Sequence, residues 1–266
     1  MVKRLQSLFK ERQRINCSYV KFCCNIRKLN MLKLAQTIIL LCFFSTNFAH
    51  ALPEKAKPKL IQLEYDLTRD GKLFAKVKES FSQNGNQYTI KSVTKGVGVY
   101  ALMGERVLTS TGVVTKAGLK PSRFELRQGK SAKKTLIADF NWAKNKLIMQ
   151  VKGETRAEKL VPGTQDLASY FYQFMYSPPT KDEVRVTLTT GKKLNQYQYK
   201  VLARSIKLDA ANKSFKTLHI ANQANAGDEK KQLWLAEDQF YLPVRYALTD
   251  EDGDSFEQVL TKIHVE

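Results

Sequence analysis

Apolar and polar residues alternate with a period of two through most of this chain. In the segment 61–68 (IQLEYDLT) every second residue is apolar, a pattern typical of a β-strand with one buried face. Turn residues such as Asp70-Gly71 separate such segments. The others lie at residues 73–82, 88–94, 106–115, 121–127, 134–140, 146–152, 184–189, 196–202, 215–221, 231–236, 242–248 and 256–265. We therefore expect a mainly β domain built on one large, curved antiparallel sheet or open β-barrel.

One segment departs from this alternation. Between residues 164 and 177 apolar side chains recur at spacings of three and four, which predicts a helix with one apolar stripe. Thr164 is its expected N-cap, and Pro178 follows its expected end. We expect this single main helix to pack in the concavity of the sheet, either as a plug of the core or also as the wall of a ligand cavity. The candidate ligand-lining residues are Leu167, Tyr170, Phe171, Phe174 and Met175.

Residues 31–51 have the features of a secretory signal peptide. Lys33 precedes an apolar run at residues 38–44, and the segment ends in Ala49-His50-Ala51, which is an A-x-A cleavage site. The apolar run is shorter than the ~20 residues that span a bilayer as a helix. We expect cleavage between Ala51 and Leu52 and a periplasmic mature protein.

The signal divides the chain into four parts. Residues 1–30 are rich in Lys and Arg and end just before a methionine, Met31, so they are either a misassigned start or a basic extension of the signal. Residues 52–60 (LPEKAKPKL) contain two prolines and three lysines, which is typical of a flexible leader. Residues 61–266 are expected to form a single β-rich domain.

The positive charge of the chain is unevenly distributed. Its formal net charge is +19, and residues 52–150 contain 19 basic against 8 acidic residues, whereas residues 151–266 contain 16 of each. A basic half attracts anions, which for an exported protein means lipid headgroups or other envelope polyanions and excludes nucleic acid as a partner. A solvated lysine-rich surface is the alternative.

No pattern of catalytic or metal-binding residues is present. All four cysteines precede the predicted cleavage site, so the mature domain would have neither a disulfide nor a zinc-thiolate site. His219 and His264 lie in separate predicted strands, and the S-x-x-K match at Ser92 and Lys95 lies in a strand, where the two side chains point to opposite faces. We predict a protein that is not an enzyme and has no cofactor or metal.

Several short motifs resemble one family of exported proteobacterial proteins, the domain of unknown function 3108. The motifs are Phe140-Asn-Trp142, the segment 162–166 (PGTQD), Tyr197-Gln-Tyr199, the segment 233–236 (LWLA) and the segment 241–245 (YLPVR). The resemblance extends from about Leu63 to Leu260 and implies an envelope protein without an established activity. Asn141 replaces the Asp that this family usually has in its F-D-W motif. The expected architecture is also similar to that of periplasmic lipoprotein carriers, which is an analogy of fold alone.

These observations favour a periplasmic protein that binds or carries a lipid-like or other hydrophobic molecule of the envelope. Its expected partners are a lipid or another anionic envelope molecule, with peripheral membrane contact; the sequence specifies no oligomeric state. The alternative is a non-enzymatic envelope scaffold or protein-interaction module.

Overall fold

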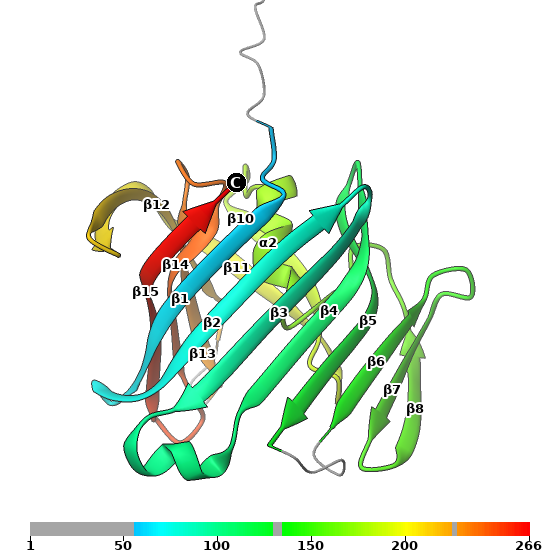
Figure 1. Ribbon diagram of the computed structural model, residues 1–266. Helices are drawn as coiled ribbons and strands as arrows, with labels where there is room; N and C mark the ends of the chain where they lie inside the picture. The colour runs from blue at the N-terminus through cyan, green and yellow to red at the C-terminus, as the bar shows by residue number, and fades with distance from the viewer. Residues whose placement is uncertain (1–55, 130–134, 225–227) are drawn as a thin grey trace, which may run out of the picture. The chain divides into compact units, whose positions relative to one another are not determined.

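The computed structural model describes residues 56–129, 135–224 and 228–266, which belong to one compact unit beginning at Ala56. The predictions for residues 1–51, and residues 52–55 of the predicted leader, lie outside these residues. The described part contains a mixed sheet, one α-helix and one 3-10 helix (Figure 1). The elements are β1 (Leu60–Arg69), β2 (Lys72–Asn84), β3 (Gln87–Gly96), η1 (Gly98–Met103), β4 (Arg106–Thr115), β5 (Gly118–Gln128), β6 (Leu136–Asn141), β7 (Lys146–Val151), β8 (Glu154–Lys159), β9 (Gln165–Asp166), α2 (Ser169–Tyr176), β10 (Glu183–Thr189), β11 (Leu194–Ala210), β12 (Lys213–Asn222), β13 (Lys230–Ala236), β14 (Leu242–Thr249) and β15 (Ser255–Val265).

The strands form a single sheet in the order β8-β7-β6-β5-β4-β3-β2-β1-β15-β14-β13-β12-β11-β10-β9. From β1 to β8 and from β10 to β15 consecutive strands are antiparallel neighbours, as the turn residues predict, whereas the consecutive strands β8 and β9 lie at opposite ends of the order. The first strand also pairs with the last, with Ile61 opposite Val265. The ladders are antiparallel except for the short parallel pair of β9 and β10. The mainly antiparallel, mainly β fold is therefore confirmed.

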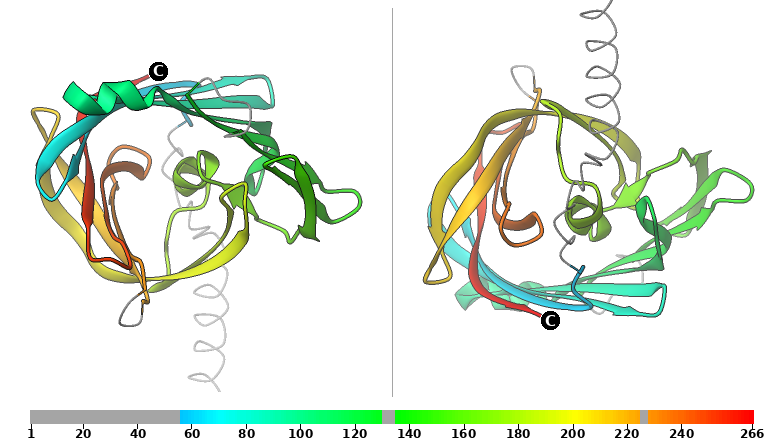
Figure 2. Two further views of the ribbon diagram at one scale, coloured as in Figure 1. Left: turned by 90° about the horizontal axis from the view of Figure 1, so that it is seen from below. Right: turned by 90° about the horizontal axis from the view of Figure 1, so that it is seen from above.

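The sheet curls around α2 but does not close into a barrel (Figure 2). Its β9 edge meets β5 through side chains, because the Nε2 of Gln165 donates to the carbonyl oxygen of Leu119 at 2.9 Å. No ladder forms there; β5 instead pairs with β6, from Arg123 to Leu126. Strands β6 to β8 continue outward from that point (Figure 2). The sheet is thus curved and open.

The helix α2 (Ser169–Tyr176) lies in the concavity, as expected, but begins later than the predicted N-cap at Thr164. Thr164 does not cap it, because its hydroxyl donates to the carbonyl of Val161 at 2.7 Å. Asp166 instead bonds the backbone at the start of the helix: its Oδ1 accepts hydrogen bonds from the backbone N–H groups of Ala168 and Ser169, both at 2.9 Å. The segment before the helix is therefore held by strand β9, which the sequence did not reveal.

Two further elements escaped the alternation pattern. Strand β8 (ETRAEK) is exposed along its whole length, so it carries no apolar face, and its charges suit the unpaired edge of a sheet. The 3-10 helix η1 follows β3 and has no buried residue. Gly96 ends β3, and an added Cβ there would lie 2.2 Å from the carbonyl oxygen of Tyr100. Only a glycine allows η1 to fold back at this distance.

Candidate ligand-binding cavity

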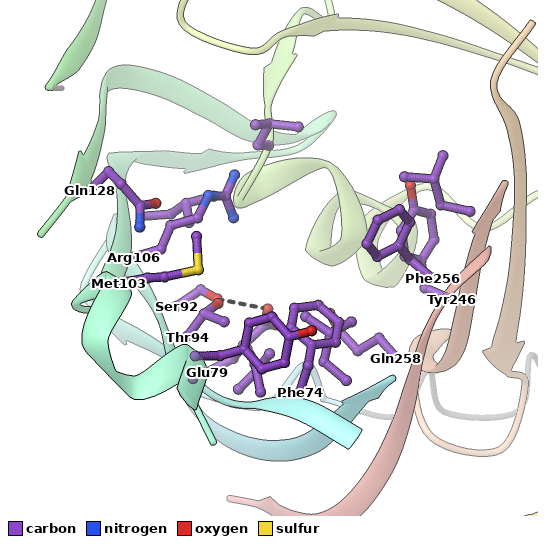
Figure 3. A pocket seen from close by; sticks show the side chains of 18 of the residues that line it. Phe74, Glu79, Ser92, Thr94, Met103, Arg106, Gln128, Tyr246, Phe256 and Gln258 are labelled. Carbon is purple, nitrogen blue, oxygen red and sulfur yellow. Dashed lines mark hydrogen bonds between the residues drawn. The ribbon is translucent and has the colours of Figure 1, made fainter. Parts of the chain in front are cut away.

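A cavity of about 460 Å³ opens between the start of α2 and the inner face of the sheet (Figure 3). This volume lies in the range of roughly 300–1,000 Å³ that small-molecule sites occupy. Strands β1 to β5, η1, α2, β14 and β15 all contribute to its wall. The lining residues are Leu67, Phe74, Ala75, Val77, Glu79, Ser92, Thr94, Gly96, Tyr100, Met103, Gly104, Arg106, Leu108, Gln128, Leu167, Tyr170, Phe171, Tyr246, Leu248, Phe256 and Gln258.

The strand period explains which side chains face the cavity. On β2, Ala75, Val77 and Glu79 line it, and Phe74 joins them where the pairing with β1 is irregular. The residues between them, Lys76 and Lys78, point outward and pair with carboxylates of β1 at 2.7 and 3.2 Å. Because side chains alternate between the faces of a strand, the same sequence pattern makes a wet outer face and an apolar inner wall.

Aromatic rings form much of the wall. Phe74 makes edge-to-face contacts with Tyr100 and Phe256, at centroid distances of 5.7 and 6.1 Å. Phe171 meets Tyr246 in the same way at 5.8 Å. Such contacts stabilise ring orientations, so the wall is a packed aromatic surface supplied by α2, η1 and three strands.

A carboxyl group is buried at one side of the cavity. The hydroxyl of Ser92 donates to Oε1 of Glu79 at 3.0 Å (Figure 3), and the hydroxyl of Tyr172 donates to Oε2 at 3.4 Å. Burial raises the pKa of Glu79 to about 7, although both hydrogen bonds favour its ionised form. This carboxyl therefore changes protonation state near neutral pH.

Arg106 brings the second ionisable group into the wall. It begins β4 and stands opposite Thr94 of β3 and Gln128 of β5, and all three line the cavity. Figure 3 shows Arg106 and Gln128 on the same side of the space. Burial lowers the pKa of the Arg106 guanidinium, but an arginine keeps its charge in proteins. A positive charge thus faces a largely apolar cavity.

The 3-10 helix η1 lies at the border of the cavity and exposes large apolar side chains. Tyr100 and Met103 line the cavity, whereas Leu102 is 91% exposed and Val99 77%. A short segment that joins the cavity wall to exposed apolar groups is unusual for a surface that meets only water.

The structure separates the five predicted lining residues into two groups. Leu167, Tyr170 and Phe171 line the cavity. Phe174 and Met175 are buried in the core and are not among its lining residues, because they lie one turn further along α2. The sheet residues of the cavity, Glu79 and Arg106 above all, were missed. For Glu79 the available signal was its place as a single charged residue between Val77 and Phe81 on the inner face of β2.

The remaining sequence motifs have structural roles. Ser92 bonds Glu79, while Lys95 pairs with Glu105 at 2.8 Å, so the S-x-x-K match brings no serine and lysine together. His219 stacks on Trp234 at 4.1 Å. The described residues contain no cluster of three or more candidate metal ligands among His, Cys, Asp and Glu. In the same residues, no helix has the length and apolar character needed to cross a membrane.

The motif at residues 162–166 joins α2 to the sheet. Oδ2 of Asp166 accepts a hydrogen bond from the hydroxyl of Ser110 on β4 at 2.6 Å, and Gln165 bonds β5 as described above. Burial raises the pKa of Asp166 to about 6. The motif therefore positions the helix that covers the cavity.

Two other motifs of the resemblance, at residues 140–142 and 241–245, also support the fold. The indole N–H of Trp142 donates to the carbonyl of Pro121 at 2.6 Å, and the buried hydroxyl of Tyr65 donates to the carbonyl of Pro243 at 2.9 Å. A search of curated proteins gave no match. The family described as "Protein of unknown function (DUF3108)" matches residues 63–261, a stretch that begins in β1 and ends in β15. The chain therefore belongs to this family.

Proposed function

We propose that this protein binds or carries a lipid-like or other hydrophobic molecule of the cell envelope, and that it does so in the periplasm. One observation carries the proposal: a cavity of about 460 Å³ whose wall is mostly aliphatic and aromatic. Open apolar surface of this kind is costly in water and gains free energy when an apolar ligand covers it. The signal features of residues 31–51 support the location.

The proposal extends to peripheral contact with a membrane. Leu102, Val99 and Met103 of η1 are exposed at the border of the cavity. Apolar side chains at this place suit contact with a lipid surface, from which a ligand would pass along Tyr100 and Met103 into the cavity.

The direct test is native mass spectrometry of protein purified gently from cells that produce the full-length chain, followed by denaturing lipid extraction. We expect a protein mass that begins at Leu52 and a stoichiometric adduct of lipid size. An apo mass that persists after delipidated protein is challenged with a fluorescent fatty acid and a phospholipid analogue would contradict the proposal. That result would favour the envelope scaffold.

A pair of variants tests whether the adduct occupies the cavity. Gln258 lines the cavity on β15, between its strand neighbours Leu67 on β1 and Tyr246 on β14. Gln258→Trp would therefore fill space that a ligand needs. Gln62→Trp places the same ring on an exposed position of β1. We expect the first variant to lose the adduct and the second to keep it; equal adducts in both would place the ligand elsewhere.

Membrane contact has its own matched pair. Leu102 of η1 is 91% exposed and Leu202 of β11 is 57% exposed, and Leu202 does not line the cavity. We expect Leu102→Ser to reduce co-sedimentation with vesicles of phosphatidylethanolamine and phosphatidylglycerol, and Leu202→Ser to leave it unchanged. Equal vesicle binding by both variants would show that η1 does not make the membrane contact.

A further inference from the structure

We infer that Arg106 binds the headgroup of the ligand, and that the ligand is an amphipathic anion: an acyl chain that ends in a carboxylate or a phosphate. This inference rests on the proposed function and adds the chemical class of the ligand. It starts from the charges in the cavity, where Arg106 is the only basic residue and Glu79 the only carboxyl among the lining residues.

The guanidinium of Arg106 makes no hydrogen bond or ion pair with any other described residue. Other arginines of the domain differ: Arg123 pairs with Asp139 at 2.7 Å, and Arg127 pairs with Glu125 at 3.2 Å. Those pairs lie on the exposed surface, where water alone would solvate the charge. Arg106 is the more buried group, and its charge has no counterion in the wall.

Glu79 does not fill that role. Its two oxygens accept hydrogen bonds from Ser92 and Tyr172. In the sheet it stands opposite Ser92, whose other neighbour is Leu108, two residues beyond Arg106 along β4. Glu79 on β2 is therefore two strands away from Arg106 on β4, and it also lies one row of inward-facing residues further along the sheet. The described residues show no hydrogen bond or ion pair between the two side chains.

The neighbours of Arg106 extend the polar site. Thr94 and Gln128 flank it on the adjacent strands, so a hydroxyl, a guanidinium and a carboxamide form one row across β3, β4 and β5. A guanidinium binds carboxylate and phosphate oxygens through two parallel N–H bonds. Hydrogen bonds from Thr94 and Gln128 would complete the contacts of such a headgroup.

The rest of the wall is apolar. Leu67, Leu248 and Phe256 come from β1, β14 and β15, while Leu167 and Phe171 come from the α2 side. A ligand that satisfies the whole cavity therefore needs one anionic end and a hydrocarbon body. A neutral hydrocarbon would leave the arginine unpaired in a medium of low dielectric constant, which is unfavourable.

The experiment compares three ligands that share one chain: dodecanoate, dodecyl phosphate and 1-dodecanol. Binding to delipidated protein, prepared from cells that produce the full-length chain, is measured by isothermal titration calorimetry at concentrations below micelle formation. We expect the wild type to bind at least one of the two anions about tenfold or more tightly than the alcohol. The tighter of the two anions identifies a carboxylate or a phosphate as the preferred headgroup.

Variants then assign the preference to a residue. Arg106→Gln should remove the difference between anion and alcohol, and Arg106→Lys should retain part of it, because lysine keeps the charge but not the two parallel bonds. The matched control is Arg127→Gln on β5, an arginine that does not line the cavity. Circular dichroism confirms that each variant is folded, and if Arg106→Gln does not fold, the lysine variant and the wild-type comparison still decide.

The outcomes separate this inference from the function on which it rests. Equal binding of the alcohol and both anions by the wild type, or an anion preference that persists in a folded Arg106→Gln variant, overturns the inference while lipid binding stands. Binding of none of the three ligands overturns both. A preference lost with Arg106 and kept in the Arg127 variant supports both.

Discussion

The hydroxyl of Ser92 donates a hydrogen bond to the carboxyl of Glu79 across the β2–β3 ladder, at 3.0 Å. The two residues stand directly opposite each other in register, on the face that lines the cavity. A sheet thus places a titratable group on its inner wall with one partner from the next strand and a second, Tyr172, from the helix. The protonation state of Glu79 is consequently coupled to the packing of α2.

The pKa of Glu79 predicts how stability depends on pH. Burial raises this pKa from 4.5 to about 7 in the folded protein, so the unfolded chain loses its proton at lower pH than the fold does. The contribution of Glu79 to the free energy of unfolding is therefore constant below pH ~4.5, falls between ~4.5 and ~7, and levels off above. The total change is on the order of 3 kcal/mol.

Urea denaturation of wild type and Glu79→Gln at several pH values measures this effect. The difference between the two proteins isolates Glu79, because groups such as Asp166 contribute equally to both. We expect the glutamine variant to gain stability relative to wild type as the pH rises from 5 to 8. A difference that does not change with pH would mean that the carboxyl is not desolvated.

Asp166→Ala should destabilise the domain strongly. The substitution leaves the hydroxyl of Ser110 and the backbone N–H groups of Ala168 and Ser169 without their acceptor. Relief of the buried charge offsets part of this loss, and we expect a net cost of about 2–4 kcal/mol at pH 7. Asp139→Ala, which removes an exposed partner of Arg123, should cost less than about 1 kcal/mol. If urea denaturation shows the same loss in the free energy of unfolding for both variants, the motif at residues 162–166 does not have this structural role.

Phe81→Ala tests the packing between the sheet and α2. Phe81 is fully buried and stacks on Tyr88 at 6.4 Å and on Tyr172 at 5.5 Å. Removing the ring should cost about 3–5 kcal/mol, through lost burial and the space left behind. Leu73→Ala on the same strand removes a side chain that is 41% exposed and should change stability by less than about 0.5 kcal/mol. Similar melting temperatures for the two variants would contradict this packing.

Gly96→Ala should displace η1 from the border of the cavity. The new methyl group would meet the carbonyl of Tyr100 at 2.2 Å, closer than any real contact, so η1 must move. We expect faster hydrogen exchange at the amide of Val97, which bonds the carbonyl of Phe74 at 2.8 Å. In Gly85→Ala the methyl group meets open space, and the strain of the positive φ of 59° at this position is confined to the β2–β3 turn, so exchange in η1 should stay as in the wild type. Unchanged exchange in both variants would show that η1 does not rest on β3.

The sequence predicted the sheet well because its signal is local. Alternation marks a strand wherever one face is wet and the other buried, and the observed β4 has the predicted bounds of Arg106–Thr115. Strand β8 was missed because neither of its faces is buried. The pairing of β1 with β15 was not predictable either, because register between distant strands depends on contacts that no local pattern encodes.

The cavity could be predicted only from its helical side. An apolar stripe reveals the buried face of α2, and three of its five residues line the cavity. Whether a stripe contacts core or open space depends on the curvature of the sheet opposite, which accounts for the different places of Phe171 and Phe174. Arg106 and Glu79 belong to no sequence motif, because the residues that define their surroundings lie on other strands.

The ladder between β1 and β15 has a consequence for how the chain is made. Strand β1 lies in the middle of the sheet, and its second edge stays open until the last eleven-residue strand has been synthesised. A growing chain that starts to fold early exposes this edge to other chains, and such edges promote aggregation. Delivery across a membrane as an unfolded, finished chain would avoid that interval, because both partners of the central ladder would then arrive together.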